Sequence, residues 1–158
     1  MAFRSHITRP LDPRSRSNVA ISALTLVAAA AGGVLALIAD RTLFLPVLAA
    51  GATFTSWALG RELDPDHQAT GLAAAVPAGA LVLLGFEISI LVTVAALMSA
   101  RLLVETTGRR PLASDLAAMV VLASAVSYTA LGWVFGFGLA IAIYLDDRMA
   151  ETHNNRAV

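Results

Sequence analysis

Long apolar runs without charge, separated by short polar segments, dominate the hydrophobic pattern of this chain. Residues 17–39, 42–60 and 68–86 form three such runs, each ended by charged residues, and residues 88–104 form a fourth with Arg101 near its end. About 20 apolar residues in a helix match a hydrocarbon layer about 30 Å thick. The alternation of apolar and polar positions that a membrane barrel requires is missing. The pattern therefore predicts helices that cross a membrane.

The last apolar run, residues 116–145, is too long for one crossing. As a single helix, its roughly 30 residues would measure about 45 Å, so we expect the chain to fold back near Gly132. The sequence thus predicts an all-α polytopic membrane protein, a compact bundle of six transmembrane helices. We expect spans at about residues 19–39, 42–60, 66–86, 88–104, 112–131 and 133–147, with a disordered basic tail at 1–18 and a second tail at 148–158.

Arginine placement gives the orientation. All eleven basic residues are arginines, and six crossings leave only Arg41 on the side opposite the two termini. Basic residues concentrate on the cytoplasmic side of membrane proteins, which predicts that both termini are cytoplasmic. A version with five crossings would move Arg148 and Arg156 to the outside. The exclusive use of arginine, with abundant Ala and Gly, suggests a GC-rich bacterial genome and hence a bacterial plasma membrane.

Composition narrows the function classes. The chain is 58% hydrophobic and 14% charged, with a formal net charge of +0, so nothing favours a nucleic-acid partner. Cysteine is absent, which excludes disulfides, thiolate metal sites and a cysteine nucleophile. The expected partners are the lipid bilayer and either a second copy or another membrane protein.

Small residues four positions apart predict helix contacts, because they let lipid-embedded helices approach closely. One set is Ala28, Gly32 and Ala36, and the other is Gly132, Gly136 and Ala140. The abundance of Ala and Gly in this chain would also produce such spacings by chance.

The segment between the second and third spans is a candidate polar site, comprising Arg61, Glu62, Asp64, Asp66 and His67. Three carboxylates at alternate positions of an extended loop would point the same way and could hold a divalent cation. The alternative is structural: Asp64 caps the next helix, Pro65 takes its first position, and Asp66 lies in its first turn. Tryptophan is enriched at membrane boundaries, so we also expect Trp57 near the inner boundary.

Asp146 and Asp147 could converge with this loop at the cytoplasmic face. A metal-dependent enzyme acting on lipid or prenyl phosphate would need such a cluster, and a divalent cation would be its cofactor. The sequence patterns of CDP-alcohol phosphotransferases, membrane prenyltransferases and intramembrane proteases are missing. We assign no catalytic residue.

Three functions remain open at this point: a non-catalytic membrane subunit for transport or assembly, the lipid-active enzyme, and a passive channel. The channel would be lined by hydroxyls, which more often bond back to their own helix; they belong to Thr53, Ser56, Ser89, Thr93, Ser124 and Ser127. No ionisable residue lies near the middle of a span, which disfavours a self-sufficient proton-coupled pump. In size and span count the chain resembles the small substrate-binding subunits of energy-coupling-factor vitamin transporters, an analogy of architecture alone.

Overall fold

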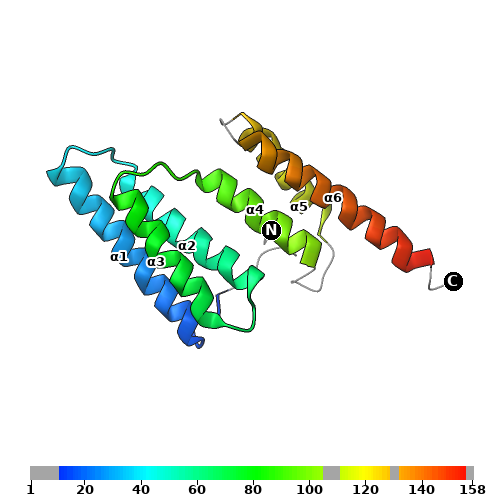
Figure 1. The fold of residues 1–158 in the computed structure, drawn as a ribbon, viewed down its shortest axis with the longest axis horizontal. Coiled ribbons are helices and arrows are strands. Elements are labelled where there is room, and N and C mark those ends of the chain that lie inside the picture. Colours follow the sequence, from blue (N-terminus) through cyan, green and yellow to red (C-terminus); the bar gives the residue numbers. More distant parts are fainter. Residues whose placement is uncertain (1–10, 105–110, 129–131, 156–158) are drawn as a thin grey trace. The chain divides into compact units, whose positions relative to one another are not determined.

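The computed structural model describes residues 11–104, 111–128 and 132–155, and within these ranges it contains six α-helices and no strand (Figure 1). The all-helical prediction and the number of helices are confirmed. The helices are α1 (Arg16–Ile38), α2 (Leu45–Leu63), α3 (Gln68–Leu83), α4 (Ile90–Val104), α5 (Ala113–Ser127) and α6 (Gly132–Asn155).

The chain divides into two compact units. We call Pro10–Thr93 the N-terminal unit and Val94–Val158 the C-terminal unit, and α4 crosses the boundary between them. In the N-terminal unit, α2 packs against both α1 and α3, and α1 also contacts α3 (Figure 1). In the C-terminal unit, α5 packs against α6.

Two helices extend beyond the spans expected from hydropathy. The expected tail at residues 1–18 is too long, because α1 begins at Arg16 and buries Ser17 and Asn18; residues 1–10 lie outside the described residues. At the other end, α6 continues through Asp147 to Asn155, into the expected C-terminal tail. Hydropathy predicts where an apolar run ends, whereas a helix continues into polar residues until a breaker or a lost contact stops it.

The turns of the N-terminal unit fall at residues with unusual backbone angles. Asp40 follows α1 with a φ of 49°, a left-handed conformation that aspartate adopts more easily than most residues. Gly85 follows α3 with a φ of 98°, which strongly favours glycine. The two turns lie at the same end of the unit, since a Cβ on Gly85 would lie 2.7 Å from Nη1 of Arg41.

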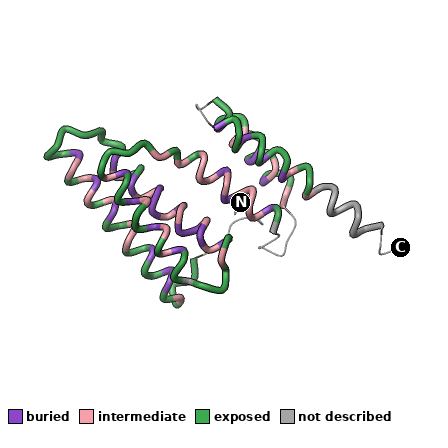
Figure 2. Tube along the Cα trace, viewed as in Figure 1, coloured by how far each residue is buried: buried purple, intermediate pink, exposed green. Residues whose placement is uncertain are grey.

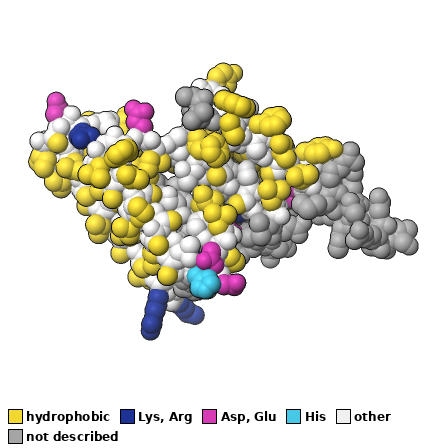
Figure 3. Space-filling view, viewed as in Figure 1, with side chains coloured by type: hydrophobic (Ala, Val, Ile, Leu, Met, Phe, Trp, Pro, Cys, Tyr) yellow, Lys and Arg dark blue, Asp and Glu magenta, His cyan; other side chains and the backbone are white. Residues whose placement is uncertain are grey.

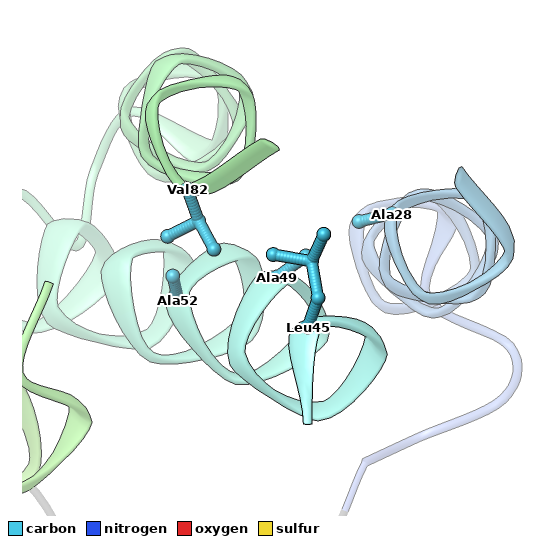
Figure 4. Close-up of a cluster of buried hydrophobic side chains, with 5 residues drawn as sticks. All are labelled: Ala28, Leu45, Ala49, Ala52 and Val82. Atoms are coloured by element: carbon cyan, nitrogen blue, oxygen red, sulfur yellow. The ribbon is translucent and has the colours of Figure 1, made fainter. Parts of the chain in front are cut away.

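The core of the N-terminal unit is built mainly from alanine. Figure 4 shows its buried side chains from α1, α2 and α3 pointing toward one another: Ala28, Leu45, Ala49, Ala52 and Val82. Side chains this small let the helix backbones approach closely. At Gly32, an added Cβ would lie 2.9 Å from Cα of Pro46 on α2. Close backbone packing therefore provides the contacts that larger side chains provide in other cores.

The outward faces of the helices are apolar. Figure 2 places buried residues on the inner faces and exposed residues on the outer ones, and many of the exposed side chains are large hydrophobics. By length and composition, one helix among the described residues, α1, could cross a membrane. The apolar helical stretches in α3, α4, α5 and α6 are shorter, at 10–17 residues.

Candidate polar site between α2 and α3

The segment between α2 and α3 is shorter than the sequence suggested. α2 continues to Leu63, so Arg61 and Glu62 lie in its last turn, and Asp64 is its C-cap residue. The predicted N-cap is therefore wrong: His67, not Asp64, precedes α3. Pro65 gives the physical reason, because a residue before proline is disfavoured in the helical region, and Asp64 has φ −139° and ψ 78°.

The carboxylate of Asp64 accepts hydrogen bonds from two side chains. Its Oδ1 accepts a hydrogen bond from Nδ1 of His67 at 2.9 Å, and its Oδ2 accepts one from the Thr70 hydroxyl at 2.8 Å. The bond from His67, followed by the bond from Thr70, lowers the pKa of Asp64 from its usual value. The carboxylate thus connects the end of α2 to the first turn of α3.

The three acids do not form the extended row that a cation site would need. Glu62 is helical and buried, whereas Asp66 is exposed in the turn. Among the described residues, no three histidine or acidic side chains gather closely enough to hold a metal ion. Asp146 and Asp147 lie on α6, in the C-terminal unit, and the side chain of Asp147 is outside the described residues. Their convergence with this segment stays a prediction.

Arg61 belongs to a network that sequence reasoning missed. Its guanidinium lies over the Trp57 ring, with Cζ 4.9 Å from the ring centre, and its Nη1 donates to Oδ1 of Asn18 at 3.1 Å. Nε1 of Trp57 donates to the hydroxyl of Ser17 at 3.4 Å. Trp57 is only 3% exposed, because the indole is packed inside the unit. Its place near a membrane boundary stays a prediction. The network connects the start of α1 to the end of α2.

Two glycines hold α3 close to this network. A Cβ on Gly60 would lie 2.9 Å from Cα of Gly71, and a Cβ on Gly71 would lie 2.9 Å from Cδ1 of Trp57. Larger residues at either position would separate α2 from α3. Gly60 and Gly71 lie equally far along the chain from the turn at Pro65 and Asp66, which is the signal that could have paired them.

The two predicted sets of small residues differ in how far they are buried. Ala28, Gly32 and Ala36 are all buried on α1. On α6, Gly132 and Gly136 are buried but Ala140 is exposed; the buried positions continue instead at Leu139 and Ala142. Gly136 lies against Ser127 of α5 and would place a Cβ 2.7 Å from the Ala123 carbonyl oxygen. α1 packs against two helices, α2 and α3, whereas α6 packs against α5, so the buried face of α6 is narrower.

Most of the hydroxyls considered for a channel bond to their own helices. Those of Thr53, Thr93, Ser124 and Ser127 each donate to the carbonyl oxygen four residues earlier, at 2.7–3.2 Å. Such bonds within a helix are the alternative to a channel lining that was expected for these hydroxyls. None of these four interactions requires water or an ion.

Comparison with protein-family models, with curated proteins and with solved structures finds no match for this chain. Function is therefore inferred from the residues and their geometry.

Proposed function

We propose that this chain is an integral membrane protein with six transmembrane helices and both termini in the cytoplasm of a bacterial cell. We further propose that it acts as a non-catalytic subunit, for transport or assembly, in an oligomer or larger complex. The exposed apolar surface of α1 carries the first proposal, and the way in which the polar residues bind one another supports the second.

α1 exposes the side chains that a water-soluble protein would bury. Only 22% of an apolar stretch of 18 residues in α1 is buried, and Leu26 and Leu37 are 70% and 81% exposed. The core helix of a soluble protein is mostly buried, because apolar area in water is costly, at about 25 cal/mol per Å². Lipid on the outer face would remove that cost.

Charged residues of the N-terminal unit lie at its two ends. Residues 17–38, 45–60 and 68–83 of its helices carry no ionisable side chain. Figure 3 shows charged side chains at opposite ends of the unit with hydrophobic ones between them. The 23 residues of α1 correspond to about 35 Å, which suits a hydrocarbon layer of about 30 Å crossed with some tilt.

The polar side chains of the candidate site stabilise one another. Arg61 binds Asn18 and stacks on Trp57, while Asp64 binds His67 and Thr70. These contacts join consecutive helices, which is a structural role. Among the contacts of the described residues given above, none favours the metal-dependent enzyme through Glu62, Asp64 and Asp66, and none favours the channel.

Topology labelling tests the membrane proposal directly, because the natural chain has no cysteine. Single variants Thr42→Cys and Asp66→Cys should react with an impermeant maleimide from opposite sides of the membrane, with Ala157→Cys reacting from the same side as Asp66→Cys. Labelling of Asp66→Cys and Ala157→Cys from different sides would contradict six crossings.

Fractionation and intact mass give the control. The full-length chain should stay in membranes washed with alkaline carbonate. A chain shortened by cleavage after α1 would instead identify that helix as a signal sequence.

The subunit proposal predicts that a mild-detergent extract contains the chain in a complex larger than its 16.4 kDa monomer.

A further inference from the structure

Three arginines lie where α1 begins and α2 ends. Arg14 and Arg16 are exposed at the start of α1, and Arg61 reaches the same place through its bond to Asn18. In the described parts of the chain, none of the three has a carboxylate within salt-bridge distance; the pair found there joins His67 to Asp64. Within the described residues, their guanidinium groups are therefore not in direct contact with a carboxylate.

Arg61 is held in a fixed orientation. The Trp57 ring supports one face of the guanidinium, and Asn18 accepts a hydrogen bond from Nη1. A guanidinium has five N–H donors in a planar arrangement that suits phosphate oxygens. Orienting the group in advance lowers the entropic cost of binding such an anion.

The surroundings favour the phosphate of a lipid over a soluble anion. Leu11, Val19 and Leu63 are exposed hydrophobic residues close in sequence to the three arginines. The guanidinium groups thus lie where the apolar surface of the unit meets its charged end, which is the depth of phospholipid headgroups.

Acidic residues at this end are mostly engaged in other interactions. Asp64 binds His67 and Thr70, Asp12 accepts a hydrogen bond from the backbone N–H of Arg14, and Glu62 is buried. Asp66 is exposed in the turn. In Figure 3, basic side chains project from this end beside the acidic and histidine side chains.

We propose that Arg14, Arg16 and Arg61 form a binding surface for the phosphate groups of anionic phospholipids in the adjacent membrane leaflet. This inference rests on the proposed membrane location. Beyond that location, it names the class of lipid that is bound and the arginines that bind it.

The test uses the full-length chain in detergent, titrated with phosphatidylglycerol or with phosphatidylcholine while thermal unfolding is followed. Phosphatidylglycerol should raise Tm at lower concentration than phosphatidylcholine. The double variant R14Q/R16Q should weaken the apparent affinity for phosphatidylglycerol by about fivefold per arginine removed, from about 1 kcal/mol for each basic residue near an anionic surface. Both side chains are exposed, so the fold should tolerate their replacement.

The matched control is Arg41→Gln at the opposite end of the unit, which should leave the lipid preference unchanged. Equal responses to the two lipids, or an equal loss in Arg41→Gln, would overturn the proposal. A Tm increase produced by inorganic phosphate alone at the same concentration would overturn it in favour of a soluble anion. If the chain washes out of membranes, the proposed membrane location is wrong. Fractionation shows this before any lipid is added, so that failure is distinguished from a failure of the lipid-binding proposal.

Discussion

At the scale of single residues, Asp64 shows how proline decides the role of a neighbour. Aspartate is a residue type that often caps the start of a helix. Here Asp64 precedes Pro65, and the proline keeps it out of the helical region, so that α2 ends at Leu63. Its carboxylate then accepts hydrogen bonds from His67 and Thr70. A residue that looked like the start of one helix thus connects two.

The pKa of Asp64 predicts an acid-dependent contribution to stability. Its pKa in the folded protein is lowered from 3.8, so the ionised form is favoured by folding. The contribution is fully present above the unfolded value and is lost as pH falls through the lower folded value. Asp64→Asn should therefore be less stable than the natural protein at pH 7, and the difference should shrink below about pH 4.

Thermal unfolding in detergent at several pH values measures this difference. Asp66→Asn is the control, since Asp66 is exposed in the same turn and has no hydrogen bond within the described structure like those of Asp64. A constant difference between Asp64→Asn and the natural protein from pH 7 to pH 3 would contradict the assignment.

At the scale of elements, the N-terminal unit contains two helix hairpins in which neighbouring helices approach closely at glycines. Gly60 meets Gly71 across the turn between α2 and α3, and Gly32 meets Pro46 across the turn between α1 and α2. Antiparallel helices joined by a short loop place such residues side by side. Small residues at paired positions therefore decide how closely the helices pack.

Adjacent glycines on α1 make this testable. Gly32→Ala would place a Cβ 2.9 Å from backbone atoms of Pro46, whereas a Cβ on Gly33 would lie 3.8 Å from Cγ of Pro46, an ordinary contact. We expect Gly32→Ala to destabilise the protein by about 1–3 kcal/mol through overpacking. Gly33→Ala should be neutral or stabilising by up to about 1 kcal/mol, because alanine favours helix. Denaturation of both variants in the same detergent tests the difference, and equal effects would contradict this packing.

At the scale of the whole molecule, the exposed apolar surface is the feature that supports the proposed membrane location. Large hydrophobic residues point outward on α1 and elsewhere in the described chain. In water, replacing such a side chain by a charged one changes stability little. In lipid, the same replacement is costly at the middle of the bilayer and tolerated near its edge.

Leu26 and Ile38 separate these cases. Both are largely exposed, but Leu26 lies near the middle of α1 and Ile38 at its end. Leu26→Arg should cost about 3 kcal/mol of insertion free energy and reduce the membrane-integrated fraction. Ile38→Arg should be tolerated, because the long side chain reaches the headgroups. Glycosylation-based insertion assays compare the two, and equal tolerance would indicate a surface that faces water.

Individual residues show what a linear pattern leaves open. Trp57 is packed beneath Arg61 inside the unit, which the sequence pattern does not show, since Asn18 and Ser17 of α1 come close to it only in the folded hairpin. Ala140 follows a spacing of four from Gly136 but is exposed, because the buried face of α6 continues at Leu139 and Ala142.

The order and kind of the elements followed from the sequence alone, because apolar runs, prolines and charged ends act over neighbouring residues. Tertiary structure decided which residues meet: Arg61 with Asn18, and Gly32 with Pro46. These contacts join positions on different helices, and they depend on helix rotation and separation. Both are fixed by the packing of many small side chains at once, which a one-dimensional pattern does not contain.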